Sequence, residues 1–301
     1  MTALPPASGL LRVDKPAGPT SHDVVAVARR ALGTRRIGHT GTLDPLATGL
    51  LVLCVGAATR LVEFLTGLPK CYRAGVRLGV RTSTDDLEGE VVATSDAWRT
   101  FARADVARAL ASLRGRIHQR PPSFSAKKVG GESAHYRARR GEEVTLPAVE
   151  VEVHALELVD WAPPRLGLDV RCSAGTYVRA LARDLGEALG TGAHLESLRR
   201  TEIGPFHVDG ALDLDALHDP GAVTCGWITP AAALAHLPRI EVDAEQAARL
   251  AHGQSIPLQE TAGRAEAGPF AVLRGDELIA VGERAGDRLR PRKVFAASDG
   301  A

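Results

Sequence analysis

One acidic residue stands by itself in a loop rich in glycine and threonine. Asp44, in the segment GHTGTLDPLATG from Gly38 to Gly49, is the only carboxylate between Asp23 and Glu63. Glycines let a backbone approach a ligand closely, and a solitary acid beside His39 could act as a nucleophile or a base. The alternative is an Asp-Pro turn in which the side chain caps its own backbone. The local sequence leaves both interpretations open.

A cation at an unfavourable place in a helix is the second candidate. Arg179 falls in the first turn of TYVRALARDLGEALG, where the helix dipole disfavours positive charge, and its neighbours at i±3 and i±4 are not acidic. It also borders the apolar stripe of this helix. A buried arginine needs a carboxylate or phosphate partner, whereas the alternative is a solvated surface arginine. Arg183, by contrast, has Glu187 four residues on and is predicted to form an ordinary surface pair.

The tyrosines are the third candidates, because the chain has only three and each lies in a distinctive segment. They are Tyr72, Tyr136 and Tyr177. Tyr72 lies on the apolar face of the alternating segment KCYRAGVRLGV, which is typical of a core tyrosine. In an RNA-facing cleft the same ring could stack on a base.

The charge of the chain is unevenly distributed. The formal net charge is +1, but residues 1–150 carry +8 and residues 151–301 carry −7, and the cations are 32 Arg and 5 Lys. A basic half raises the expectation of a polyanionic partner, and guanidinium groups suit phosphate contacts. The basic clusters expected to make such contacts are Arg29/Arg30/Arg35/Arg36, Lys127/Lys128, Arg137/Arg139/Arg140 and Arg199/Arg200.

Several familiar cofactor sites are absent from the sequence. The segment GTRRIGHT has the glycine spacing of a phosphate-binding loop, but His39 stands where lysine is needed and a helix precedes the segment. No GxGxxG follows a strand, and the four cysteines form no CxxC pair. Asp85 and Asp86 could form a metal pair, although adjacent acids in TSTDDLEG are more typical of a solvated turn. We therefore predict chemistry without a metal, nucleotide or flavin cofactor.

No segment predicts a membrane or export role. The longest apolar run, 50–55, is far shorter than the roughly 20 residues of a membrane helix. The N-terminus has neither a basic nor an apolar signal region, so we expect a cytoplasmic protein with reduced thiols.

The elements that must position these residues follow one another in a mixed order. The spacing of apolar residues predicts helices over 20–33, 58–67, 104–115 and 176–190, a loop over 34–49, and strands over 9–16, 50–56, 70–80, 150–159, 167–173 and 202–212. From residue 238 the composition shifts to a small β-rich module with a helix over 243–253 and strands near 270–274, 278–282 and 290–295. This order predicts an α+β fold with a large mixed, mainly antiparallel sheet flanked by helices.

Taken together, the segments resemble the bacterial tRNA pseudouridine synthase B family, which isomerises uridine-55 in the tRNA T-loop. The matching stretches span about residues 9–206 and are LLRVDKPAGPTSHDVV, RRIGHTGTLDPLATGLL, KCYRAGVRLG, QRPPSFSAKKVGG and CSAGTYVRALARDLGEALGTGAHLESLRRTEIGPF. The resemblance implies the pseudouridine synthase fold, with a catalytic domain over 1–237 and a PUA-like RNA-binding domain over 238–301. It also implies a monomer that needs no cofactor and binds the T-arm of tRNA.

The resemblance also implies roles for individual residues. Asp44 would be the catalytic aspartate, paired with Arg179, and Tyr72 would pack against the target base and act in proton removal. His39 would stack in the remodelled T-loop. The further residues expected at the substrate are Thr42, Tyr177, Leu198 and Lys15. The family often has tyrosine where this chain has Phe124, so a hydroxyl is missing there while packing is retained.

Two other functions are consistent with the same residues. A noncatalytic protein could bind or fold tRNA through the same cleft, without turnover at Asp44. A metal-dependent RNA hydrolase could instead use Asp85 and Asp86. Loss of turnover with retained tRNA binding on substitution of Asp44, and insensitivity to EDTA, would separate the isomerase from both.

Overall fold

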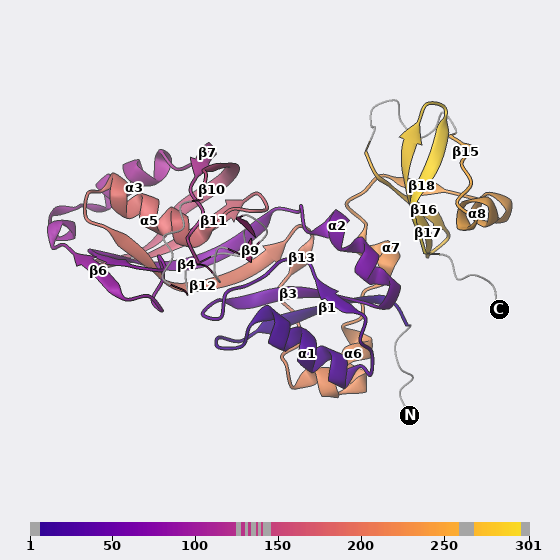
Figure 1. Cartoon of the computed structure of the whole chain (residues 1–301), viewed down its shortest axis with the longest axis horizontal. Helices are drawn as coiled ribbons and strands as arrows, with labels where there is room; N and C mark the ends of the chain where they lie inside the picture. Colours follow the sequence, from indigo (N-terminus) through magenta and orange to yellow (C-terminus); the bar gives the residue numbers. More distant parts are fainter. Residues whose placement is uncertain are drawn as a thin grey trace.

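A nine-stranded sheet crosses the part of the molecule formed by residues 9–207 (Figure 1). The computed structural model describes residues 7–124, 128–129, 132–133, 137, 140, 146–258 and 268–295. The strand order is β1-β3-β12-β4-β11-β10-β7, with β2 added to β3 and β13 added to β12. The strands are β1 (Gly9–Lys15), β2 (Ile37–His39), β3 (Thr48–Val55), β4 (Lys70–Leu78), β7 (Gly115–Gln119), β10 (Val149–Ala162), β11 (Arg165–Cys172), β12 (Ala193–Ile203) and β13 (Phe206–His207).

The predicted mixed, mainly antiparallel arrangement is confirmed. Only β12 and β3 run parallel among the paired strands of the described sheet, and every other neighbouring pair is antiparallel. Two small hairpins lie outside this sheet, β5 (Val80–Thr82) with β6 (Val91–Thr94) and β8 (Lys128–Val129) with β9 (Glu132–Ser133).

Helices cover the two ends of the sheet separately. The helix α1 (Ser21–Ala31) packs on β1 and β3, and its Thr20 cap accepts a hydrogen bond from the Asp23 backbone N–H. The helices α3 (Arg103–Ala111) and α5 (Val178–Ala188) pack on the other end, over β10 and β12 (Figure 1). The remaining short helices are α2 (Val62–Leu65), α6 (Pro220–Cys225), α7 (Pro230–Ala233) and the 3₁₀ turns η1 (Gly56–Leu61), η2 (Ala97–Thr100) and η3 (Ala216–His218).

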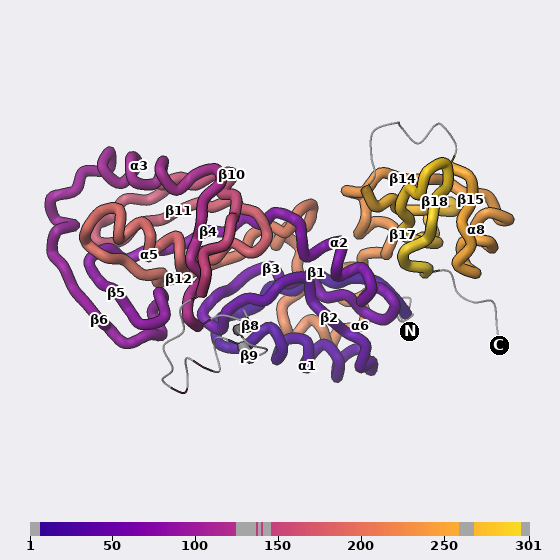
Figure 2. Tube along the Cα trace, turned by 45° about the horizontal axis from the view of Figure 1, so that its top comes forward, coloured from indigo at the N-terminus to yellow at the C-terminus, as the bar shows by residue number. Residues whose placement is uncertain are grey.

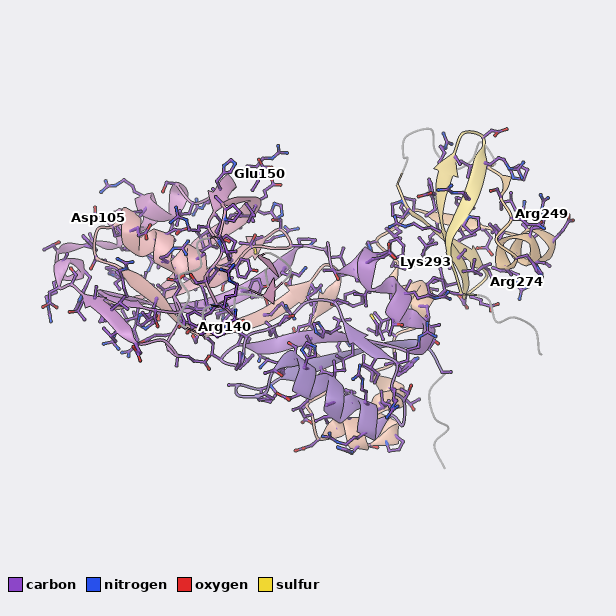
Figure 3. All side chains as sticks on the ribbon, in the orientation of Figure 1. Asp105, Arg140, Glu150, Arg249, Arg274 and Lys293 are labelled. Atoms are coloured by element: carbon purple, nitrogen blue, oxygen red, sulfur yellow. The ribbon has the colours of Figure 1, made fainter. Side chains whose placement is uncertain are left out.

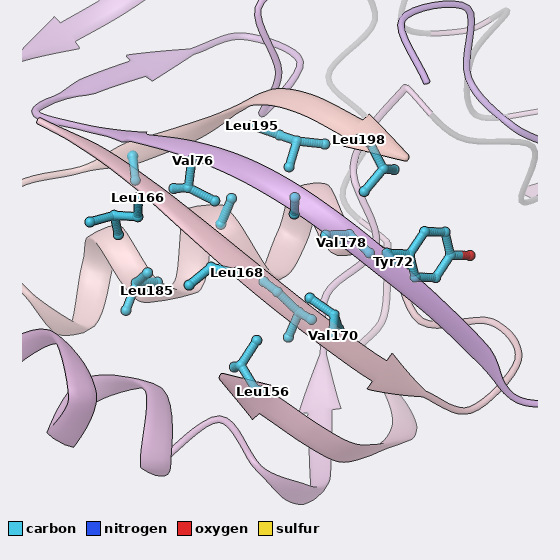
Figure 4. Packing of buried hydrophobic residues seen from close by; sticks show 14 of the residues in the cluster. Tyr72, Val76, Leu156, Leu166, Leu168, Val170, Val178, Leu185, Leu195 and Leu198 are labelled. Carbon is cyan, nitrogen blue, oxygen red and sulfur yellow. The ribbon is translucent and has the colours of Figure 1, made fainter. Parts of the chain in front are cut away.

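An aliphatic cluster fills the space between β4, β11, β12 and the helix α5. Figure 4 shows Leu166, Leu168 and Leu185 in its interior and Tyr72 at its end, with the tyrosine hydroxyl pointing away from the aliphatic side chains. The buried side of α5 therefore fixes the start of this helix, where Arg179 lies, against the strand that carries Tyr72.

Strand β12 was missed by the sequence prediction because a bulge breaks its alternation. Leu195 and Leu198 are both buried although they are three positions apart, a spacing that places residues of a regular strand on opposite faces. The register of β12 against β4 shifts between Leu195 and Ser197, so an extra residue restores both leucines to one face. A pattern search with a period of two cannot detect such a strand.

Three smaller differences follow from local geometry. The predicted helix over 58–67 is a 3₁₀ turn followed by the single turn of α2, and the predicted loop over 34–49 contains β2. The predicted strand over 202–212 ends at Ile203, because Gly204 with φ of +51° reverses the chain before β13.

A second sheet of five strands is built from the described residues after 238. Its order is β14-β16-β17-β18-β15, formed by β14 (Arg239–Glu241), β15 (Ile256–Pro257), β16 (Phe270–Arg274), β17 (Glu277–Ala285) and β18 (Arg288–Val294), with α8 (Ala244–Ala251) packed on it. Figures 1 and 2 show this unit at one end of the molecule, beside α2. The predicted β-rich C-terminal module is thus confirmed.

A charged contact joins the second sheet to α2. Arg292 and Lys293 both pair with Glu63, and the Arg292 guanidinium lies over the Phe64 ring. Figure 3 shows Lys293 on the side of the C-terminal unit that faces α2, with Arg249 and Arg274 on the opposite side. Apolar residues of both units also share one buried cluster, which includes Leu61 and Leu273.

None of the helices in the described segments is long and apolar enough to cross a membrane.

Candidate active site

Asp44, Arg179 and Tyr72 line one pocket, although they are far apart in the sequence. The cavity has a volume of about 280 Å³ and lies where the loop before β3 meets the start of α5 and the strand β4. The lining residues are Thr40, Gly41, Thr42, Leu43, Asp44, Thr66, Lys70, Tyr72, Ala174, Gly175, Thr176, Tyr177, Val178, Arg179, Leu198 and Arg200.

The buried side chain of Arg179 has carboxylate partners, as its position in the helix led us to expect. The Arg179 side chain is only 5% exposed, and its Nε lies 3.0 Å from Asp44 Oδ2. Its Nη1 lies 3.3 Å from Asp86 Oδ2. The guanidinium also donates to the main-chain carbonyls of Thr84, at 3.1 Å, and Phe124, at 2.9 Å. Arg179 is therefore held from several sides, and the solvated alternative is wrong.

The contact with Phe124 does not depend on the side chain at that position. Arg179 Nη2 donates to the main-chain oxygen of Phe124, which any residue would supply. The exchange of tyrosine for phenylalanine, noted in the sequence, therefore leaves this contact intact.

Asp44 lies on the open side of the ion pair. Its side chain is 40% exposed, whereas the side chain of Asp86 is 4% exposed. Since Arg179 contacts both, the buried aspartate supports the arginine from inside while Asp44 faces the cavity. Such a carboxylate is charged, oriented and accessible to a ligand in the pocket.

Asp86 is a site residue whose role the sequence did not indicate. We interpreted Asp85 and Asp86 as a metal pair or a solvated turn, and both interpretations are wrong. Asp86 pairs with Arg179, and its Oδ1 accepts hydrogen bonds from the Thr84 hydroxyl and the Glu88 backbone N–H. Asp85, whose φ is +61°, pairs with Arg183 at 3.1 Å. No group of three potential metal ligands occurs in the part of the chain that the structure describes.

Arg183 is accordingly not an ordinary surface pair with Glu187. Its side chain is half-buried, and it contacts Asp85 and Asp184 instead. Burial raises the pKa of the Asp85 carboxyl, while the nearby Arg183 opposes that rise. The turn after β5 is thus tied to α5 by two separate arginines, Arg179 and Arg183.

Lys15 supports the loop of Asp44 from behind. The residue is fully buried, and its Nζ donates to the main-chain oxygens of Pro16 and Pro19, both at 2.8 Å, and of Pro45, at 3.3 Å. Burial lowers the pKa of its ammonium, and the charge of Asp44 opposes this effect. A buried ammonium with three carbonyl partners is not placed to contact a substrate, so the expectation of a direct contact is corrected to a positioning role.

Substitution of Lys15 by methionine is expected to destabilise the fold. The change leaves the three carbonyls without their donor, which costs about 3 kcal/mol of unfolding free energy. Urea denaturation followed by circular dichroism measures the difference. A loss below about 0.5 kcal/mol would show that the carbonyls find other partners.

Tyr72, Leu198 and Tyr177 form the apolar wall of the pocket. Tyr72 is 9% exposed and Leu198 is 8% exposed, and they come from the neighbouring strands β4 and β12. Burial raises the pKa of the Tyr72 hydroxyl, and the positive charge of Arg200 opposes this rise. Tyr72 thus belongs both to the core and to the pocket wall. A core tyrosine and a tyrosine whose ring faces a bound base, the two interpretations of the sequence, are therefore compatible.

Gln119 holds Tyr177 at the entry to α5. Its Oε1 accepts from the Tyr177 backbone N–H at 2.8 Å, and its Nε2 donates to the Tyr177 carbonyl at 3.1 Å. Gln119 is fully buried. It begins the motif QRPPSFSAKKVGG, but the sequence alone assigned it no role.

His39 and Thr42 lie at the outer part of the site. Thr42 is exposed and lines the pocket. His39 lies beside the pocket, at the end of β2, where its Nδ1 accepts from the Gly41 backbone N–H at 3.3 Å and its ring meets His22 edge to face. Burial, aided by His22, lowers the pKa of His39, which favours the neutral ring.

The basic clusters are only partly available to phosphates. Arg29, Arg30, Arg35 and Arg36 are exposed, as expected. Arg200 is not, because it is 1% exposed, and Arg199 pairs with Asp14 at 2.6 Å. Arg137 and Arg140 belong to the described residues. Lys127, Arg139 and Tyr136 lie outside them, as does the Lys128 side chain.

Lys70 is a second titratable group in the pocket wall. It is 6% exposed, and its Nζ donates to the Thr66 and Leu68 carbonyls. Burial, with the added effect of Arg200, lowers its pKa from 10.5 to about 8.

The lowered pKa of Lys70 predicts a stability that depends on pH. Between about pH 8 and 10.5 the unfolded chain binds a proton that the folded chain has released, so the free energy of unfolding rises with pH. The variant Lys70→Met lacks the part of this pH dependence that comes from Lys70. The other titrating groups affect the free energy of unfolding of the variant and of the wild type equally. The difference between the two unfolding free energies should therefore change across this window and stay constant between pH 6 and 7.5. A constant difference up to pH 10.5 would contradict the shift.

Comparisons with known proteins agree with the fold. Residues 29–178 match the family described as TruB family pseudouridylate synthase (N terminal domain), and residues 179–224 match the tRNA pseudouridylate synthase B C-terminal domain. The chain is 45% identical to tRNA pseudouridine synthase B of Arthrobacter sp. (strain FB24), over 97% of this chain and 98% of the relative. It is 44% identical to the protein of that name from Synechococcus sp. (strain WH7803), over 96% and 98%.

A solved structure has the same architecture. A chain of an H/ACA RNP bound to a substrate RNA containing 2′-deoxyuridine superimposes with a TM-score of 0.75 and 25% identity, covering 97% of this chain and 86% of that chain. Together with the sequence matches over almost the whole length, this shows that the chain belongs to the TruB family of pseudouridylate synthases.

Proposed function

We propose that this chain converts uridine-55 in the T-loop of tRNA to pseudouridine, with Asp44 as the essential carboxylate. The observation that carries the proposal is the Asp44–Arg179 pair, in which a partly exposed carboxylate is held by a buried guanidinium in the wall of the pocket. The relatives named tRNA pseudouridine synthase B, which match nearly the whole chain, support the same activity.

The reaction fits the groups in the pocket because it is an isomerisation. The bond between ribose C1′ and uracil N1 breaks, and a bond between C1′ and C5 forms. C5 loses one proton and N1 gains one, so no electron or net proton is exchanged and no cofactor is required. Asp44 starts the reaction from its charged form, and the apolar wall keeps the detached uracil from escaping into water.

The remaining residues divide into substrate contacts and supports. Tyr72 and Leu198, on adjacent strands, pack against the two sides of the flipped base, and the Tyr72 oxygen takes part in proton removal at C5. Tyr177 and Thr42 contact the nucleotide at the entry to the pocket. His39, outside the pocket, stacks in the T-loop and keeps the uridine extruded, which costs a few kcal/mol that stacking and phosphate contacts repay.

The two sheets suggest separate functions for the two parts of the chain. We assign catalysis to residues 1–237 and a PUA-like RNA-binding role to residues 238–301, and we expect the protein to act as a monomer. Arg249 and Arg274 lie on the side of the C-terminal unit that faces away from α2, where an RNA could reach them (Figure 3).

Mapping of pseudouridine in a T-arm minihelix tests the proposed function. The purified chain should convert the uridine at position 55 and leave a minihelix with cytidine at that position unchanged. Bound but unmodified RNA would instead support a noncatalytic tRNA-binding protein. Cleaved RNA whose appearance is blocked by EDTA would support the metal-dependent hydrolase.

Binding of tRNA is expected to weaken with salt. If the exposed arginines and their neighbours contact roughly four phosphates, the dissociation constant rises about 100-fold between 50 and 200 mM salt. Exchange of Arg30 and Arg35 for serine should reduce the slope, since both are exposed. Filter binding over a salt series measures this, and a flat response would contradict phosphate contacts.

A further inference from the structure

Arg200 is a buried cation to which the proposed mechanism assigns no role. It lies on β12, opposite Tyr72 of β4 on one side and Gly49 of β3 on the other. The residue is 1% exposed, so it cannot serve as a surface contact for phosphate. In the described part of the chain, no carboxylate pairs with it.

Its guanidinium binds main-chain oxygens of the segment that contains Asp44. Nε donates to the Leu50 carbonyl at 2.8 Å, Nη2 to Gly41 at 2.9 Å and Nη1 to Thr42 at 3.4 Å. These carbonyls lie on both sides of Asp44 in the chain. A single planar group therefore fixes the beginning and the end of the catalytic loop relative to β12.

The backbone of Arg200 adds a second constraint on the same loop. Gly49 has φ of +96°, and a Cβ at this position would lie 2.2 Å from the Arg200 carbonyl oxygen. The glycine lets β3 approach β12 closely, and this keeps Leu50 within reach of the guanidinium. The loop cannot move away from β12 without breaking these contacts.

The same side chain lies beside Tyr72, and its positive charge opposes the rise in the pKa of the tyrosine hydroxyl that burial causes. Both residues line the pocket that contains Asp44. The charged and titratable groups around this hydroxyl are Arg200 from β12, Cys172 at the end of β11 and Asp44 from the loop. Of these, Arg200 is the group that stabilises the phenolate.

We propose that Arg200 is a positioning residue for the reaction, one that locks the Asp44 loop to β12 beside Tyr72. This inference rests on the proposed function. It explains why a charged side chain is buried beside the pocket with carbonyls as partners, where an apolar residue would pack at lower cost. A donor fork with fixed geometry is needed to reach these three carbonyls together.

Arg200→Lys tests the proposal, with Arg73→Lys as the matched control. Arg73 is also on the central strands, but it is exposed and pairs with Asp169. Lysine keeps the charge of Arg200 but loses the fork. We expect the single-turnover rate at saturating tRNA to fall about 100-fold, because a shift of about 1 Å at reacting groups has an effect of this size. The dissociation constant of tRNA should stay within threefold, and Arg73→Lys should match the wild type.

The pH profile and a double-mutant cycle separate this role from a merely structural one. Arg200→Gln removes the charge, so the rising limb of the rate against pH should move to higher pH, while Arg200→Lys should keep the wild-type profile. In a Tyr72→Phe background, Arg200→Lys should lower the rate by a smaller factor than in the wild type.

The results of these experiments distinguish a failure of the positioning role of Arg200 from a failure of the proposed function. If the wild-type chain forms no pseudouridine, the proposed function is wrong. If the wild type is active but Arg200→Lys matches it, or loses only tRNA affinity, the positioning role is overturned. If Arg200→Lys does not fold, the profile of Tyr72→Phe decides: a rising limb identical to that of the wild type would overturn the link between Arg200 and Tyr72.

Discussion

Replacement of Asp44 by asparagine is expected to abolish pseudouridine formation, with a loss of rate on the order of 10⁴-fold or more. Asparagine has the shape of aspartate but carries no negative charge, so it can neither attack nor accept a proton. The Arg179 guanidinium keeps its second carboxylate, Asp86, and the fold should therefore remain intact. Release of tritium from tRNA labelled at uridine C5 measures the rate, and gel shift measures binding.

The matched control for this variant is Asp169→Asn. Asp169 is partly exposed and pairs with Arg73, and neither residue lines the pocket. It should leave turnover unchanged, and both variants should bind tRNA within about threefold of the wild type. Full turnover by Asp44→Asn would show that another group carries the reaction.

Substitution of Arg179 is the second change with a large expected effect. Arg179→Lys keeps a positive charge but cannot bind Asp44 and Asp86 together, since an ammonium lacks the planar fork. We expect a loss of rate on the order of 10³-fold with nearly unchanged tRNA binding, because the side chain is buried. Single-turnover kinetics at saturating tRNA measure the chemical step, and a loss below tenfold would contradict the orienting role of the ion pair.

Arg179→Met tests the structural side of the same pair. It leaves the Asp86 carboxylate buried without its cation, which should cost about 3–5 kcal/mol. Adding Asp86→Leu removes the uncompensated charge, so the double variant should regain much of the stability while remaining inactive. Recovery of activity together with stability would mean that Arg179 serves the fold alone.

The sequence indicated those site residues whose type is unfavourable at their own position in a helix or loop. Arg179 is a cation in the first turn of α5, an unfavourable place that indicated a buried anionic partner, and Asp44 is that partner. Such violations of local preference are detectable in one sequence because the unfavourable context is itself local.

The residues that were misjudged depend on contacts between distant segments. Asp86 is an ordinary turn residue by composition, and only the approach of α5, more than ninety residues later in the chain, makes it part of the site. Arg200 and its neighbour Arg199 look like one basic surface cluster, but successive residues of a strand point to opposite faces. Without β12, which the bulge concealed, this distinction could not be predicted.

The place of β12 in the sheet has a consequence for how the chain folds. It lies between β3, which follows Asp44, and β4, which carries Tyr72. These two strands therefore have no common neighbour until residues 193–203 have emerged from the ribosome. Before that point the sheet can exist only as two separate halves, β1-β3 and β4-β11-β10-β7. Pairing across so long a separation in sequence is slow. The catalytic pocket therefore cannot form before β12 is available, and a nascent chain gains its activity only when the two halves are joined.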